Sequence, residues 1–188
     1  MAKISVPFHN DQQKQTLWCW VAVAANAYNS LKPQTSPNIR QCEVAQIVMD
    51  GDQCNAPVNE IRILADALDA VGIRDHGPED PDLDFLLNEL APGRGSDHEV
   101  EPVCAKIRWN GDQGGIHFIA VSGADPDMGD GHVFVEDPYL GPGNAIEYDL
   151  HDFTSSYAAN DPNYPPPRTA RGTVVAFQRV VRPPVLDV

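Results

Sequence analysis

The hydrophobic period of the chain changes after the loop Gly93–Asp97, and this change constrains the fold more than any other feature. Before the loop, apolar residues recur three and four positions apart, which is the spacing of amphipathic helices. After it, short apolar runs are separated by Gly, Asp and Pro turns, as in strands. Helices followed by strands are typical of an α+β protein with segregated layers. The 188 residues are expected to form a single domain, with a helical lobe at about 1–92 and a β lobe at about 98–182.

Individual elements follow from the same patterns. Helices are expected at 18–31, 38–50, 58–71 and 83–90. The third of these carries Leu64 and Leu68 at helical spacing and stops at Gly72. Strands are expected at 100–109, 116–123, 132–136, 145–148 and 173–181, with a short helical turn at 150–157.

The first helix begins with the tripeptide Trp18-Cys19-Trp20, followed by small apolar residues. A cysteine at the start of a helix has its sulfur where backbone N–H groups point outward, and the helix macrodipole there favours thiolate over thiol. A thiolate is a nucleophile, so Cys19 is suited to attack a carbonyl carbon. The structural alternative is a buried apolar cysteine that packs and does no chemistry.

Two later residues complete a chemical pattern. His117 lies in the apolar run that begins at Ile116, and Asp137 directly follows the strand expected at 132–136. An imidazole can take and return a proton near neutral pH, and a carboxylate can orient that imidazole. The alternatives are a strand histidine satisfied by a backbone partner and an aspartate that starts a turn before Pro138. Cys, His and Asp in this order suggest a cysteine hydrolase whose site lies in a cleft between the two lobes.

These residues, with Gln13, Gly115-Ile116-His117-Phe118 and Asp137-Pro138, resemble the papain-like cysteine peptidases. The most similar branch is the compact bacterial peptidases with a W-C-W nucleophile motif, found in secreted effectors and toxins and related to bacteriocin-leader peptidases. The resemblance follows motif order from about Val6 to Tyr139 and covers the strands to Val181 more loosely. One departure is Val21, where the family commonly has Ala.

The resemblance implies a papain-like fold and a peptidase that hydrolyses peptide bonds of protein substrates without a cofactor. Cys19, His117 and Asp137 would form the triad, and Gln13 would donate its amide to the oxyanion alongside the Cys19 backbone N–H. Trp18 and Gly115 would line the substrate cleft. The expected partners are a polypeptide substrate and, as a second class, an inhibitor or immunity protein.

Two further functions stay open on sequence alone. An amidase, deamidase or transglutaminase shares the acyl-enzyme intermediate, so the motif does not separate these enzymes from a peptidase. A papain-fold module that binds without catalysis is the third candidate, although the presence of all four expected polar residues argues against it.

Composition excludes several other classes. Thirteen basic against 27 acidic residues give a net charge of −14, which argues against a nucleic-acid or anionic-lipid surface. No apolar run approaches the ~20 residues that cross a bilayer. The N-terminus lacks the apolar region of a signal peptide, so we expect a cytoplasmic protein, one exported without such a signal, or one whose leader has been removed.

The four cysteines do not have the spacing of a metal site, because the chain holds no C-x-x-C and no His pair at helical ligand spacing. Cys42 and Cys54 are twelve positions apart, and a disulfide between them would staple the end of the second helix to the following loop. A reducing cytosol would keep both thiols free instead. Cys104 alternates with apolar neighbours and is expected to be buried in a strand.

Overall fold

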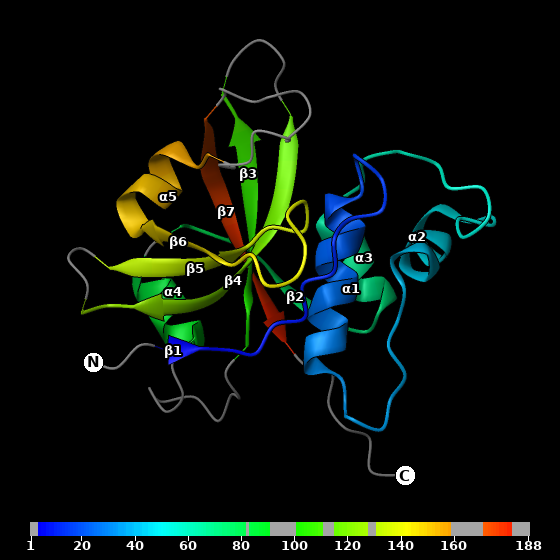
Figure 1. The fold of residues 1–188 in the computed structure, drawn as a ribbon, viewed down its shortest axis with the longest axis horizontal. Helices are drawn as coiled ribbons and strands as arrows, with labels where there is room; N and C mark the ends of the chain where they lie inside the picture. The colour runs from blue at the N-terminus through cyan, green and yellow to red at the C-terminus, as the bar shows by residue number, and fades with distance from the viewer. Residues whose placement is uncertain are drawn as a thin grey trace.

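The fold is α+β, as the sequence predicts. The computed structural model describes residues 4–81, 83–90, 101–110, 115–127, 131–158 and 171–181. Within these ranges, seven strands form one antiparallel sheet in the order β2-β7-β3-β4-β5-β6, and β1 pairs with β4 on one side of this path (Figure 1). The strands are β1 (Ile4–Ser5), β2 (Arg74–Glu79), β3 (Val103–Trp109), β4 (Ile116–Asp125), β5 (His132–Glu136), β6 (Ile146–Asp149) and β7 (Gly172–Val181).

The described residues also form five helices, α1 (Cys19–Leu31), α2 (Gln41–Met49), α3 (Leu64–Ala70), α4 (Leu83–Leu90) and α5 (Leu150–Ser156). Helices α1 to α3 form one side of the molecule, while α4 and α5 lie with the sheet on the other (Figure 1). None of these helices is both long and apolar enough to cross a membrane.

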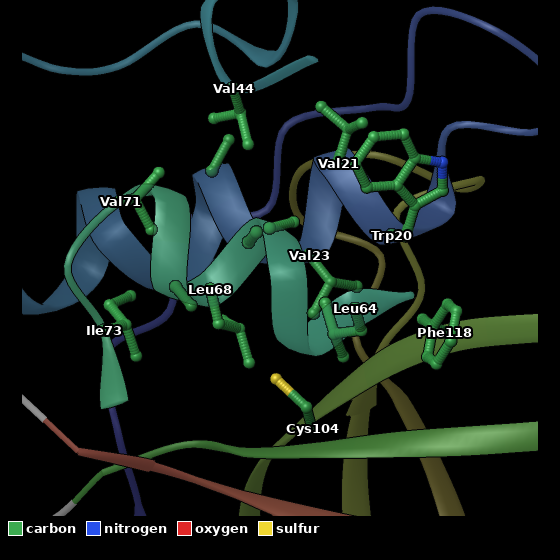
Figure 2. Packing of buried hydrophobic residues seen from close by; sticks show 14 of the residues in the cluster. Trp20, Val21, Val23, Val44, Leu64, Leu68, Val71, Ile73, Cys104 and Phe118 are labelled. Atoms are coloured by element: carbon green, nitrogen blue, oxygen red, sulfur yellow. The ribbon is translucent and has the colours of Figure 1, made fainter. Parts of the chain in front are cut away.

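The first hydrophobic cluster joins α1, α2 and α3 to one face of the sheet. Leu64 and Leu68 of α3 pack between α1 and the strands, where Cys104 and Phe118 project from β3 and β4 (Figure 2). Cys104 is fully buried in β3, as predicted. This cluster fixes α1, and therefore Cys19, against the strand that carries His117.

The second hydrophobic cluster covers the opposite face of the sheet. Leu86 and Leu90 of α4, which the sequence placed with the helical lobe, pack here against strand residues such as Ile119. Leu150 and Phe153 of α5 complete the same cluster. The sheet is therefore buried on both faces, which explains the nearly continuous burial along β4.

The expected helix at 58–71 is wrong over its first half. Only Leu64–Ala70 is helical, and residues 58–63 form neither helix nor strand and are exposed. The backbone carbonyls of Val58 and Glu60 accept hydrogen bonds from the indole N–H groups of Trp18 (2.8 Å) and Trp20 (2.9 Å). A carbonyl held this way by another segment is not available to a helix ladder, so tertiary contacts override the apolar spacing.

Smaller differences have local causes. Helix α2 begins at Gln41 rather than 38, because the backbone of Ile39 exchanges two hydrogen bonds with the side chain of Asn29 (2.8 and 3.0 Å). The sequence missed β1 and β2. Strand β2 holds Pro78 and a register shift between Asp75 and Pro78, and it lies at the sheet edge, where proline is tolerated.

Cys42 and Cys54 form a disulfide with Cα atoms 4.8 Å apart. Cys42 is in the first turn of α2, so the bond joins the start of this helix, not its end, to the loop that leads to residues 58–63. The disulfide therefore anchors the segment 58–63, whose carbonyls accept hydrogen bonds from the two tryptophans around Cys19.

Removing this disulfide in a Cys42→Ser/Cys54→Ser variant is expected to lower the free energy of unfolding by about 3 kcal/mol, the loop-closure value for a loop of this length. Urea titration of the variant and of the native protein without reductant measures the difference. A variant as stable as the native protein would contradict this expectation.

Candidate active site

The structure brings the side chains of Cys19, His117 and Asp137 together. Cys19 is the first residue of α1, and the side chain of the N-cap residue, Trp18, makes no capping hydrogen bond among the described residues. The Cys19 side chain lies close enough to the His117 ring to interact with it. His117 Nε2 lies 2.9 Å from Asp137 Oδ1. Because Nε2 faces the carboxylate, Nδ1 is the ring nitrogen left for the sulfur.

All three side chains are almost wholly buried. The exposed fraction is 3% for Cys19, 4% for His117 and 0% for Asp137. Asp137 meets this burial with donors on both oxygens: Oδ1 also accepts from the backbone N–H of Tyr139 (2.8 Å), and Oδ2 accepts from the Tyr157 hydroxyl (2.6 Å). A buried carboxylate with this set of donors can stay ionised.

The electrostatics favour a charged imidazole. Burial opposes the charged ring, but the negative charge and hydrogen bond of Asp137, together with Cys19, outweigh it and raise the pKa of His117 to about 10. For Asp137, burial alone would raise the pKa. The charge and hydrogen bond of His117, and then the donors from Tyr157 and Tyr139, hold the pKa of that carboxyl below its usual range.

Stability is therefore expected to depend on pH through His117. The pKa of this ring is 6.5 in the unfolded chain and about 10 when folded, so its contribution to stability is complete below pH 6.5 and is lost as pH rises towards 10. Unfolding free energies from urea titrations across this window measure the decline. In His117→Gln the decline should flatten, and equal slopes in both proteins would contradict the expectation.

The N-terminal strap, residues 10–13, ties the Asp137 loop to α1. Asn10 Nδ2 donates to the carbonyls of Asp137 (3.3 Å) and Gly141 (3.0 Å), and the Gln13 N–H donates to the Pro138 carbonyl (2.7 Å). Asn26, buried in α1, donates to Asn10 Oδ1 (3.3 Å) and to the Asp11 carbonyl (3.1 Å). Figure 1 shows the strap running between α1 and the loop after β5. These bonds hold the elements that carry Cys19 and Asp137 together.

Gln13 lies beside this loop, but its amide is engaged. Gln13 Nε2 donates to the carbonyls of Gln15 (2.9 Å) and Thr16 (3.0 Å), and its Oε1 is buried without a hydrogen-bond partner among the described residues. To serve as an oxyanion donor, this amide has to release one of the two carbonyls. The Cys19 backbone N–H belongs to the first turn of α1, where intrahelical partners are lacking. The role of Gln13 stays a prediction.

The two expected substrate-contacting residues lie in different settings. Trp18 is 1% exposed, yet its ring borders a cavity of about 440 Å³ lined also by Lys14, Gln15 and the Cys42–Cys54 disulfide. The Gly115 carbonyl accepts from the Trp109 N–H (3.0 Å), which pairs the ends of β3 and β4 beside His117. Contact of either residue with substrate stays a prediction.

Besides Asn10, sequence reasoning missed three residues of this site. Tyr157 donates to Asp137, and Trp109 stacks on His117 with ring centroids 5.9 Å apart. Asn26 had a signal: a polar side chain within an otherwise apolar, Ala-rich helix marks a buried hydrogen bond. Trp109 and Tyr157 had none, since aromatic residues in or near strands are most often core.

The described residues contain no cluster of three or more His, Cys, Asp or Glu side chains that could hold a metal ion. No protein-family model matches the chain, and no curated protein matches its sequence.

Proposed function

We propose that the protein is a papain-like cysteine peptidase that hydrolyses peptide bonds of polypeptides through an acyl-enzyme on Cys19. The observation that carries this proposal is the buried group of Cys19, His117 and Asp137. In this group the histidine ring interacts on one side with a cysteine at a helix N-terminus and on the other with a fully buried carboxylate. A packing cysteine needs neither partner.

The residues divide the reaction in a simple way. In the resting site the proton of Cys19 is held on His117, and the sulfur anion of this ion pair attacks the substrate carbonyl carbon to form a tetrahedral oxyanion. As this intermediate collapses, the carbon–nitrogen bond breaks and His117 gives its proton to the leaving amine. Water then attacks the thioester, with His117 accepting a proton from the water, and the new carboxyl product leaves as the sulfur anion is restored.

The surroundings favour this chemistry over passive binding. Asp137 keeps the ring positioned and charged, and Trp109 covers it on one side. The first backbone N–H groups of α1 provide donors where the oxyanion would form, next to the sulfur. A module that only binds would gain nothing from a buried, charged histidine.

A digest of a complex peptide mixture tests the proposal. Native protein and Cys19→Ala are incubated with peptides from a whole-cell extract, and mass spectrometry records new termini. We expect new amino termini with the native protein only. Modified glutamine side chains in peptides whose backbone is uncut, or peptide cross-links, would instead identify a deamidase or transglutaminase. Identical digests from the two proteins would favour a binding module.

A further inference from the structure

The Tyr157 hydroxyl occupies the side of the Asp137 carboxylate that His117 does not use. It donates to Oδ2 at 2.6 Å, while Oδ1 accepts from His117 Nε2 at 2.9 Å and from the Tyr139 N–H at 2.8 Å. With donors on both oxygens, the plane of the carboxylate is fixed. Without the hydroxyl, one oxygen would be buried with no described donor, and the group could rotate away from the ring.

The position of this hydroxyl is itself defined by the fold. The Tyr157 carbonyl accepts from the Gly172 N–H (2.7 Å), which ties the residue after α5 to the start of β7. A Cβ at Gly172 would lie 2.4 Å from Ile107 Cγ2, so a side chain here would disturb the packing of β7 against β3 at the point where Gly172 meets Tyr157. Tyr157 is 0% exposed, and its ring packs on those of Tyr148 (5.4 Å) and Trp109 (5.9 Å).

Trp109 contacts both the Tyr157 ring and the His117 ring. The centroid of its ring lies 5.9 Å from that of the His117 ring, with an interplanar angle of 25°. The centroid of the Tyr157 ring is also 5.9 Å away. Trp109 therefore packs against both side chains that hydrogen-bond the Asp137 carboxylate, His117 and Tyr157. With Tyr157 and Asp137 both fully buried, water cannot readily take over a lost hydroxyl contact.

We propose that Tyr157 is a fourth, positioning member of the site, whose hydroxyl holds the Asp137 carboxylate so that its other oxygen stays on His117. This inference rests on the proposed function for its catalytic meaning, but the contact it describes can be measured without any substrate. The hydroxyl can also accept a hydrogen bond, so it should tolerate an amide at position 137.

The test compares Tyr157→Phe with the matched control Tyr148→Phe. The Tyr148 ring packs on the Tyr157 ring, but the Tyr148 hydroxyl donates to the Ala158 carbonyl and not to Asp137. Proton NMR follows the ring N–H of His117 that faces Asp137. We expect this low-field resonance to be unchanged in Tyr148→Phe and to shift and broaden in Tyr157→Phe. We also expect the rate of Cys19 alkylation and the kcat to fall about 10-fold in Tyr157→Phe only, with KM unchanged. This is the size of effect expected for loss of one hydrogen bond to a charged group.

Combining Tyr157→Phe with Asp137→Ala distinguishes a role of the Tyr157 hydroxyl in positioning the carboxylate from a role in packing. In Asp137→Ala there is no carboxylate to hold, so adding Tyr157→Phe should leave the Cys19 alkylation rate unchanged, whereas a packing role would lower it again. Should Tyr157→Phe fail to fold, the Tyr157 hydroxyl proton in native protein and in Asp137→Asn gives the answer, because its resonance should move strongly between them.

Identical His117 resonances in the two tyrosine variants, or an unmoved hydroxyl proton in Asp137→Asn, would overturn the inference. Either result can be obtained whether or not the native protein cleaves peptides. Failure of the inference and failure of the proposed function are therefore distinguishable.

Discussion

Cys19→Ala is expected to abolish turnover, with a loss on the order of 10⁴- to 10⁶-fold, because removing a working nucleophile leaves only binding and the oxyanion donors. The fold should persist. The change removes one sulfur atom from the first turn of α1 and is expected to cost about 1 kcal/mol of stability. Peptide cleavage, followed with any substrate found in the digest, measures the loss.

The chain offers a matched control in Cys104→Ala. This variant removes the same atom from the fully buried core of β3, at a site without catalytic partners in the proposed mechanism. It should lose stability by a similar amount and keep its turnover. A Cys19→Ala protein with more than a trace of activity would contradict the assignment of the nucleophile.

Asp137→Ala is expected to lower kcat on the order of 10³- to 10⁴-fold, the range seen when the carboxylate of a triad is lost. The change removes the carboxylate that accepts hydrogen bonds from the His117 ring, the Tyr139 N–H and the Tyr157 hydroxyl. Stability should fall as well, since buried donors without acceptors are costly. Steady-state kinetics and urea titration measure the two losses.

Asp137→Asn should be much milder. Its amide oxygen can replace Oδ1 and accept from His117 and Tyr139, while its NH₂ group donates to the Tyr157 hydroxyl acting as an acceptor. Activity should fall but persist, well above that of the alanine variant. If the Asn variant were as inactive as the Ala variant, a hydrogen-bond partner would not suffice, and the negative charge itself would be required.

The sequence predicts the frame of this protein well. Strands such as β5 (His132–Glu136) coincide with the predicted range, because alternation and flanking turns are local signals. Helix α1 begins one residue from the expected start, at Cys19, since a run of small apolar residues follows the tryptophans. The order Cys19, His117, Asp137 anticipated three side chains that the structure brings together from α1, from β4 and from the residue after β5.

Tertiary contacts decide what the sequence leaves out. Residues 58–63 carry a helical apolar pattern, yet they form no helix, and two indole N–H groups donate to the backbone carbonyls of Val58 and Glu60. Asn10 and Tyr157 belong to no motif and reach the Asp137 loop only through the folded chain, 127 and 20 positions apart from their partner. Gln13 illustrates the converse: its place in the motif order predicts a role, but its amide is bonded locally.

The reactivity of the Cys19 thiol tests the Cys19–His117 pair most directly. Native protein, without reductant so that the Cys42–Cys54 disulfide stays intact, is treated with iodoacetamide near neutral pH, and mass spectrometry follows Cys19 and Cys104 separately. We expect Cys19 to react first and its rate to fall at least about 10-fold in His117→Ala, because a thiolate is favoured by a charged neighbour. Faster reaction at Cys104, or a Cys19 rate unchanged in His117→Ala, would contradict a nucleophile activated by histidine.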